Sequence, residues 1–533
     1  MPLLCIVLVS PLYLVWSVWL ATGAGDLAAQ IAWADIGEHH LDRPYVFSWY
    51  GGMHTANYSF ISPALMSVVG VRTLTVASGL AATWVAAHLL ARTSIARPVW
   101  PALLAALTLW CNVASGRTTF ALGVAFGLAA CASVCGPRGS YGLRAGAGGK
   151  GKRVALAAVW TGLATLASPV AGLFLLVVGA GYALDKQFGR ASALALPFLG
   201  VVGATTLLFP FHGEQPMFTD RLWPPLLFCA AICLAAPASW RVTRYSAAVY
   251  AAGVVLTNLV ASPVGTNVER FAELAAPPVL LAALFARVAE TPARRQVSAG
   301  LVKAAALFVV FCLSVAWVTE KTISDLRVST SVPAWAEETD GVIRELRRLD
   351  AERWRVEVLP ARNHREASLF APHVHMARGW NRQLDVERGR LFYDGTLDPA
   401  TYRQWLRHWS VKYVVTHDGR PDGPAEGEAA IIRGGPEWLE PIWQDTHWKI
   451  YRFRDAVPMA APPATVTGST PTDLTVTMSR PGTALVRVPH SPWLTVTRGC
   501  LARSGPWVRL EAPAAGTYRI TSTYNPAKLH HCS

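Results

Sequence analysis

The sequence predicts a polytopic α-helical membrane domain, followed by an exported mixed α/β segment and a C-terminal β-sandwich. Only 15% of the 533 residues are charged and the mean hydropathy is +0.30, whereas soluble domains carry about 25% charged residues. Apolar runs of 15–20 residues recur up to residue 319, as in membrane helices. The remaining 214 residues hold 24 of the 34 acidic residues and are too polar to span a bilayer. The 21 Trp, 18 Phe and 14 Tyr exclude a disordered chain.

The first part of the chain divides into about eleven predicted spans. Several are shorter than the roughly 20 residues that a span needs, so their ends are approximate. The break at Ser168–Pro169 is either a short hop between two spans or a kink in one long helix. The spans are 3–22, 73–91, 99–115, 118–135, 154–168, 170–184, 191–209, 224–240, 245–262, 271–286 and 301–319.

The loop charges predict the orientation of these spans. With the N-terminus inside, fifteen cations fall on the inner side and five on the outer side, in accord with the positive-inside rule. We therefore expect a multi-pass plasma-membrane protein with a cytoplasmic N-terminus and an extracytoplasmic tail. The formal charge of +14 then reflects topology, and it gives no reason to expect nucleic acid as a partner. The inner cations are Arg92, Arg97, Arg138, Arg144, Lys150, Lys152, Arg153, Lys186, Arg190, Arg241, Arg244, Arg287, Arg294, Arg295 and Lys303.

Residues 24–72 form the longest outer loop before the tail, and it opens on an acidic residue. Leu27, Ile31 and Ala34 recur at helical spacing, which predicts a short amphipathic helix on the outer membrane surface. Asp26 stands at the start of that helix, where an N-cap is its ordinary structural role. The functional alternative is a carboxylate at the membrane–water boundary beside a lipid-linked substrate, and the two roles are compatible.

Aromatic and polar side chains follow in the same loop. Trp49 and Tyr50 precede a Gly-Gly pair, and His54 and Asn57 follow it. One interpretation is an interfacial aromatic belt with a turn. The other is a substrate groove in which the rings stack on sugars while His54 and Asn57 bond hydroxyl or phosphate groups.

The remaining outer charges include candidates for binding an anion. Arg72, Arg117 and Arg270 are outer cations of the membrane part, and each could simply reach the lipid headgroups. Glu269 precedes Arg270, and Glu273 lies one turn further inside a span. An intramembrane acid indicates function, and we expect Arg270 as its partner.

This layout resembles the GT-C superfamily of polytopic glycosyltransferases over roughly residues 1–320. The likeness lies in the first span, the acid that follows it, the surface helix, the aromatic loop ending in Ser62-Pro63, and many further spans. The segments 69–72, 167–172 and 262–270 are also similar. The mixed segment of the tail resembles outer domains of actinobacterial membrane proteins of this general kind.

The resemblance implies transfer of a sugar from a polyprenyl-phosphate donor to a cell-envelope glycan or lipid acceptor outside the membrane. It gives the acid at Asp26 the role of catalytic base, or of a ligand for the acceptor or for a divalent metal ion. The family often has two adjacent acids, whereas Leu27 follows Asp26 here. Such chemistry needs a carboxylate to take the hydroxyl proton and cations to receive the departing phosphate.

The tail is predicted as two domains, at 320–456 and 457–533, after a membrane domain at 1–319. Its Trp380 and Asn381 belong to a polar aromatic cluster that either binds carbohydrate or forms a turn of the fold. From Pro458, short alternating runs predict the sandwich. Cys500 and Cys532 lie in this exported, oxidising part, which favours a disulfide between them. No Cys or His spacing indicates a metal site.

Two other functions fit parts of the sequence. A secondary transporter or lipid flippase could have the same number of spans, but no repeated half is visible and intramembrane charges are few. A non-catalytic scaffold with a glycan-binding tail is the other. The large exported tail favours work on an outer substrate, and P-loop and nucleophile-elbow motifs do not occur.

Overall fold

The computed structural model describes residues 1–93, 95–135, 147–289 and 297–532 and divides the chain into two compact units. Unit 1 consists of Met1–Ala21 and Ser59–Thr330, and unit 2 of Thr22–Tyr58 and Ser331–Ser533. The first loop, 22–58, therefore belongs with the tail, although the membrane helices separate the two in sequence. Four of the predicted inner cations, Arg138, Arg144, Arg294 and Arg295, lie outside the described residues.

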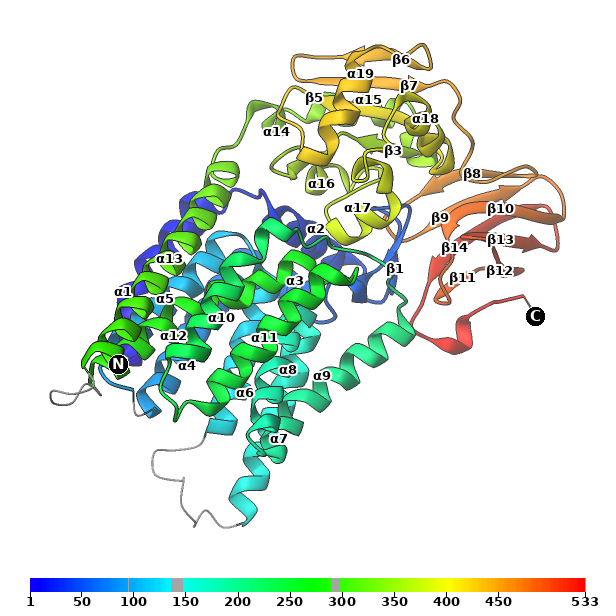
Figure 1. Cartoon of the computed structure of the whole chain (residues 1–533). Coiled ribbons are helices and arrows are strands. Elements are labelled where there is room, and N and C mark those ends of the chain that lie inside the picture. Colours follow the sequence, from blue (N-terminus) through cyan, green and yellow to red (C-terminus); the bar gives the residue numbers. More distant parts are fainter. Residues whose placement is uncertain (94, 136–146, 290–296, 533) are drawn as a thin grey trace. The chain divides into compact units, whose positions relative to one another are not determined.

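Unit 1 is helical, and each of the eleven predicted spans coincides with a helix (Figure 1). Such agreement is expected because long apolar runs fix helices locally. An additional short helix, α3 (Ser62–Val69), precedes α4. The other helices are α1 (Pro2–Val15), α4 (Val71–Arg92), α5 (Val99–Ala114), α6 (Thr118–Cys135), α7 (Ala147–Ala167), α8 (Pro169–Leu184), α9 (Phe188–Leu208), α10 (Trp223–Ala235), α11 (Arg241–Leu259), α12 (Glu269–Ala289) and α13 (Val297–Ser329).

Six helical stretches among the described residues are long and apolar enough to cross a membrane. Two shorter apolar helices, α5 and α8, accompany them. These helices make the chain a membrane protein, and the total of eleven spans stays a prediction. The six are Pro2–Leu20, Val71–Arg92, Thr118–Cys135, Phe188–Leu208, Gly265–Ala289 and Gly300–Ser329.

The structure resolves the alternative at Ser168 in favour of two helices. Helix α7 ends at Ala167, Ser168 is extended with φ −155° and ψ 112°, and Pro169 opens α8. Proline favours an extended residue before it and is well suited to the first turn of a helix. At the other end of unit 1, helix α13 continues to Ser329, ten residues beyond the predicted boundary.

The first loop folds as part of unit 2. Helix α2 (Asp26–His39) forms where the amphipathic pattern predicts one, but its buried face differs from the predicted stripe. Gln30, expected off the stripe, is buried and donates a hydrogen bond to the Tyr58 hydroxyl, whereas Ile31 is 39% exposed. The strands β1 (Tyr45–Val46) and β2 (Met53–His54) then form a hairpin.

The mixed segment of unit 2 is a five-stranded sheet in the order β4-β3-β5-β7-β6. The pairs β4–β3 and β3–β5 are parallel, whereas the pairs β5–β7 and β7–β6 are antiparallel. Its strands are β3 (Arg355–Val358), β4 (His375–Met376), β5 (Val411–His417), β6 (Leu439–Gln444) and β7 (Trp448–Phe453). Its helices are α14 (Ala334–Glu337), α15 (Asp340–Arg348), α16 (Arg365–Phe370), α17 (Arg382–Arg388), α18 (Pro399–His408) and α19 (Glu426–Arg433).

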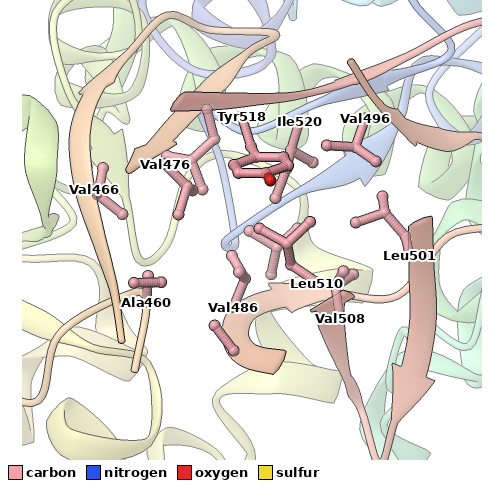
Figure 2. Packing of buried hydrophobic residues seen from close by; sticks show 14 of the residues in the cluster. Ala460, Val466, Val476, Val486, Val496, Leu501, Val508, Leu510, Tyr518 and Ile520 are labelled. Carbon is pink, nitrogen blue, oxygen red and sulfur yellow. The ribbon is translucent and has the colours of Figure 1, made fainter. Parts of the chain in front are cut away.

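Two sheets, in the orders β11-β14-β9-β8 and β10-β13-β12, form the C-terminal sandwich. Figure 2 shows its core, where residues such as Val476, Val486 and Ile520 face one another across the two sheets. Tyr45 and Phe47 of the first loop complete this core. The strands are β8 (Ala464–Ser469), β9 (Leu474–Met478), β10 (Gly482–Pro489), β11 (Leu494–Val496), β12 (Cys500–Ser504), β13 (Trp507–Ala512) and β14 (Gly516–Ser522).

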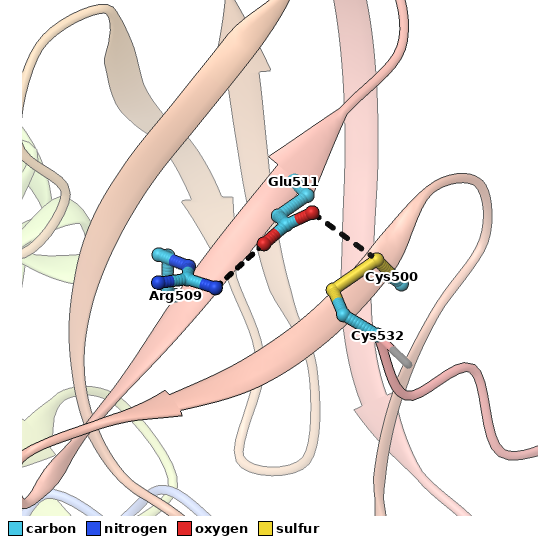
Figure 3. Close-up of a disulfide and its surroundings, with 4 residues drawn as sticks. All are labelled: Cys500, Arg509, Glu511 and Cys532. Carbon is cyan, nitrogen blue, oxygen red and sulfur yellow. Dashed lines mark hydrogen bonds and ion pairs between the residues drawn. A yellow bond between two sulfur atoms is a disulfide. The ribbon is translucent and has the colours of Figure 1, made fainter.

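A disulfide joins Cys500, the first residue of β12, to Cys532 near the C-terminus (Figure 3). Beside it, Glu511 of β13 forms an ion pair with Arg509 at 2.7 Å. The bond closes a loop with a sequence separation of 32 and attaches the final segment to the sandwich.

Candidate functional site

Unit 1 gathers five charged side chains from three elements. We call Arg117, Glu269, Glu273, Lys321 and Asp325 the five-charge network. The Arg117 guanidinium lies 2.7 Å from the Glu273 carboxylate and 3.7 Å from that of Asp325. Lys321 contacts Glu273 at 2.5 Å and also pairs with Glu269. Helix α12 supplies the two glutamates and α13 supplies Lys321 and Asp325, so the network ties these helices to the start of α6.

Four members of the five-charge network, all but Glu269, line a small cavity of about 10 Å³. That volume is about enough for one water molecule and far below what a sugar requires. Its walls include Thr108, Asn112 and Ser115, and Ser115 donates a 2.6 Å hydrogen bond to Asp325. The Asn112 side-chain oxygen is buried without a hydrogen-bond partner among the described residues. The cavity thus suits an ordered water molecule.

The structure changes the expected partner of Glu273. We predicted Arg270, but the carboxylate pairs with Arg117 and Lys321, while the Arg270 guanidinium lies 5.3 Å from the centre of the Phe120 ring. Sequence analysis missed Lys321 and Asp325 because the rise in charge after residue 319 was assigned to the tail. Their i,i+4 spacing, continuing the helical pattern of 301–319, is the signal that could have found them.

The other predicted residues of unit 1 lie near helix ends. Arg72 is exposed in the first turn of α4 and donates a 2.6 Å hydrogen bond to the Ala21 carbonyl. Glu269 is only 3% exposed at the start of α12. Arg270, the next residue, is half-buried. In this unit, therefore, Arg117 and Glu269 join one network, whereas Arg72 contacts the backbone next to the first helix.

Asp26 lies in unit 2, half-buried in the first turn of α2. Gly25 before it has φ 61°, a left-handed conformation that glycine adopts readily. A carboxylate in the first turn is also favoured by the helix dipole. The Gly25 N–H donates a 2.7 Å hydrogen bond to the Asn363 carbonyl, so a loop of the mixed domain fixes the segment that carries Asp26.

Trp49 and Tyr50 are buried in unit 2, with exposures of 1% and 0%. The Trp49 indole N–H donates to the Ala367 carbonyl at 3.3 Å, and the Tyr50 hydroxyl donates to the Gly379 carbonyl at 2.9 Å. Protein atoms therefore surround both rings. This geometry gives the two aromatics a role in packing the loop against the tail and does not support stacking on a sugar.

His54 and Asn57 are neighbours in unit 2. The His54 ring is 6% exposed, lies 2.8 Å from the Ser491 hydroxyl through Nε2 and contacts the Asn57 amide at 3.4 Å through Nδ1. The two polar residues of the His-x-x-Asn segment thus contact each other and the sandwich. The histidine holds the loop to the sandwich, which is a structural role.

A second charge network lies sealed inside unit 2. Arg378, from the loop after β4, binds Glu357 of β3 at 2.7 Å and also pairs with Glu428 of α19. The Tyr402 hydroxyl donates a 2.6 Å hydrogen bond to Glu428. Burial raises the pKa of Glu357 well above its usual value, although Arg378 opposes that shift. We call Arg378, Glu357, Glu428 and Tyr402 the sealed quartet.

The neighbouring residues Trp380 and Asn381 both contact other residues of unit 2. Asn381 caps α17, accepting a 3.0 Å hydrogen bond from the Leu384 N–H. The His364 ring stacks on Trp380 with centroids 3.4 Å apart, and the Arg382 guanidinium lies 5.0 Å from the same ring system. Asn381 therefore supports the predicted turn, and the indole of Trp380 is already engaged by two side chains.

The residues around Asp26 do not fit a divalent metal ion. Among the described residues, the one grouping of three His, Cys, Asp or Glu ligand atoms close enough for a metal is Cys500, Glu511 and Cys532. Two of those three form the disulfide, and no further acid follows Asp26 directly. We derive no step through a metal.

Comparison with known proteins yields one family match and a structural likeness. A family model described as a domain of unknown function (DUF8823) matches residues 461–499, from before β8 to just beyond β11. No curated protein matches the sequence. The crystal structure of ArnT from Cupriavidus metallidurans in the apo state is similar at 13% identity, with a TM-score of 0.39, over 86% of this chain and 99% of that one. The same protein bound to undecaprenyl phosphate gives 13% identity and a TM-score of 0.38 over 85% and 99%. A likeness at these scores carries no functional argument.

Proposed function

We propose that the chain is a membrane glycosyltransferase that moves a sugar from a polyprenyl-phosphate donor to a cell-envelope glycan or lipid acceptor outside the membrane. The observation that carries the proposal is the placement of Asp26. The carboxylate comes directly after the first apolar helix, and the Gly25–Asn363 hydrogen bond holds its segment on a polar domain. A lipid-linked donor and a water-soluble acceptor meet in such a setting. The sequence layout, which resembles that of GT-C enzymes, supports the same hypothesis.

In the proposed reaction, the Asp26 carboxylate accepts the proton of an acceptor hydroxyl. The hydroxyl oxygen bonds to the anomeric carbon of the donor sugar while the bond from that carbon to the phosphate oxygen breaks. The lipid phosphate leaves with the electron pair. General-base catalysis of this kind contributes roughly 10²–10⁴-fold to a rate.

We assign Arg270 as the cation that receives the phosphate charge, because fixed guanidinium groups stabilise phosphate oxyanions. Arg72 is a second candidate, since it is exposed at a helix end. Arg117 is already paired with two carboxylates, so we give it a supporting role within the five-charge network.

The test compares two aspartates of the same helix. Asp26→Asn should lower transfer of a radiolabelled sugar from polyprenyl-phosphate donors by at least about 100-fold in proteoliposomes. Asp35→Asn, at a 48% exposed side chain of α2, is the matched control and should keep its activity. Near-normal transfer by Asp26→Asn would refute the base. Absence of transfer by the wild type, with movement of lipid or solute across the bilayer instead, would favour the transporter or flippase.

A further inference from the structure

The three parallel strands of unit 2 end at one edge of the sheet, and each is followed by a loop rich in polar side chains. The loop after β3 carries Arg362 and His364, the loop after β4 carries Trp380 and leads into α17 at Arg382, and the loop after β5 carries Asp422. Open sheets with parallel strands bind ligands outside the carboxyl ends of those strands. We call these five residues the carboxyl-edge cluster.

Contacts join the three loops at Asp422. Its carboxylate lies 2.7 Å from the Arg382 guanidinium, 3.4 Å from that of Arg362 and 3.9 Å from Nε2 of His364. Burial raises the pKa of Asp422, but the nearby His364 and Arg382 bring it below its usual value, so the group stays ionised. The cluster is thus a fixed array of donors and one acceptor group.

His364 has two energetically unfavourable features, a strained backbone and a buried ring nitrogen without a hydrogen bond in the described part of the chain. It is a non-glycine residue with φ 54°, a left-handed conformation that costs of the order of 1–3 kcal/mol. Its ring is 6% exposed, and its Nδ1 makes no hydrogen bond among the described residues but lies 3.8 Å from the Glu366 carboxylate. The nearby Glu366 is also buried, with one carboxylate oxygen lacking a hydrogen bond among those residues. Retained strain and incompletely bonded buried polar groups are features of binding sites.

The same loop fixes the segment that carries Asp26. Asn363 accepts the Gly25 N–H bond, and the Arg365 guanidinium donates to the Thr22 hydroxyl at 2.5 Å and to the Ser331 carbonyl at 3.1 Å. Asn363 and Arg365, on either side of His364, therefore connect the carboxyl-edge cluster to the segment just before α2.

We propose that the carboxyl-edge cluster binds a neutral glycan chain. Sugar hydroxyls accept hydrogen bonds from guanidinium groups, and the Arg362 and Arg382 side chains, 51% and 22% exposed, offer such donors around the buried Asp422 carboxylate. An anionic ligand would face the Asp422 carboxylate and the buried Glu366, which oppose it. The glycan's role as the sugar acceptor rests on the proposed function, because the loop that carries Arg362 and His364 also binds the Gly25 N–H, next to Asp26, through Asn363.

The experiment uses the full chain in lipid nanodiscs and two arginines of neighbouring loops. The probes are linear hexasaccharides of glucose, mannose and arabinose, with inorganic phosphate as the anionic probe. Arg362→Gln, at a 51% exposed side chain, should weaken binding of at least one hexasaccharide about tenfold, the effect of losing one charged hydrogen bond. Arg420→Gln, at a 77% exposed side chain paired with Glu426, should leave binding unchanged.

The outcomes separate the site from the reaction. The proposal is overturned if no hexasaccharide binds at millimolar concentration, if Arg362→Gln binds as tightly as the wild type, or if phosphate binds there instead. Asp26→Asn should keep hexasaccharide binding while losing transfer, and Arg362→Gln should raise the acceptor KM with little change in kcat. Glycan binding by a wild type that transfers no sugar would refute the proposed function alone. Normal acceptor KM in Arg362→Gln would refute the acceptor role of the site.

Discussion

The two charge networks of this protein contain similar side chains but differ in their exposure to solvent. The sealed quartet of unit 2 is almost completely inaccessible, with side-chain exposures of 2% for Arg378 and 0% for Glu357 and Glu428. The five-charge network of unit 1 opens gradually, from 4% for Glu269 and 13% for Arg117 to 43% for Asp325, and it borders a cavity. Three carboxylates there face two cations.

The difference in solvent exposure indicates that one network stabilises the fold and that the other is accessible to water. In unit 2, one guanidinium contacts two buried acids, although Glu357 Oε2 and one Arg378 nitrogen have no hydrogen-bond partner among the described residues. Solvent does not reach these side chains, so the sealed quartet serves the fold. In unit 1, charges within apolar helices have few alternative partners, so each contact holds helices together while one end stays open to water. Substitutions in the two networks should therefore lower the stability of the protein by different amounts.

Removing Arg378 should have the largest effect on stability. Arg378→Met leaves Glu357 and Glu428 buried without their cation, and breaking a buried pair in this way costs about 4 kcal/mol. The free energy of unfolding from denaturant titrations measures it. Arg403→Met, which removes an exposed pair with Asp455, is the control and should cost under about 1 kcal/mol. Equal losses in both variants would contradict a sealed quartet.

Acid should destabilise unit 2 through His375. Burial lowers the pKa of His375 to about 4, whereas an unfolded histidine titrates near 6.5, so the unfolded state binds the extra proton between these values. The stabilisation is complete above about pH 6.5 and is lost as the pH falls towards about 4, by about 3 kcal/mol. His375→Gln removes this titration, and its stability should change less than that of the wild type over the same range. Parallel pH profiles would exclude His375 as the cause.

In unit 1, Lys321→Met should have an intermediate effect. Glu273 keeps Arg117, but Glu269 loses its cation, and we expect a loss of about 2 kcal/mol in detergent unfolding. Lys303→Met, on an exposed position of the same helix, is the matched control and should be near neutral. A loss as large as that of Arg378→Met would remove the contrast between the two networks.

The smallest expected effect concerns a surface cap, away from both networks. Asp398 and Thr401 form a capping box at the start of α18, with two 2.8 Å hydrogen bonds to the Asp398 carboxylate. Asp398→Ala should cost about 1 kcal/mol, and Asp398→Asn should restore most of it. Equal stability of the alanine variant and the wild type would mean that the cap is redundant.

Local sequence patterns predicted most helices and strands of this fold, but they could not predict contacts between residues that are distant in sequence. The apolar runs locate the helices of unit 1, and the short alternating runs after Pro458 locate most strands of the sandwich, because neighbouring residues alone determine such patterns. Tyr45, in contrast, hydrogen-bonds Ser522 across a sequence separation of 477, which no periodicity encodes. Strand β12 was missed because Cys500–Ser504 alternates weakly.

The candidate site shows the same limit. Asp26 was singled out because it stands at the end of the first span, where the GT-C resemblance implies a catalytic acid, and its neighbourhood with Asn363 emerged only from the fold. Trp49 and Tyr50 have the residue types of a sugar-binding surface, yet composition cannot tell a buried ring from an exposed one. Lys321 and Asp325 were hidden because a helix continued past the change in composition.

The assignment of Thr22–Tyr58 to unit 2 has a consequence for how the protein is made. The chain leaves unit 1 after Ala21, returns at Ser59 and leaves again after Thr330. Unit 2 therefore combines a segment that is synthesised early with one that is synthesised last. Tyr45 and Phe47 must wait for β14 before the sandwich core closes around them. Until then, Tyr45 and Phe47 lack the strands that bury them, so the first loop stays incompletely packed through most of synthesis.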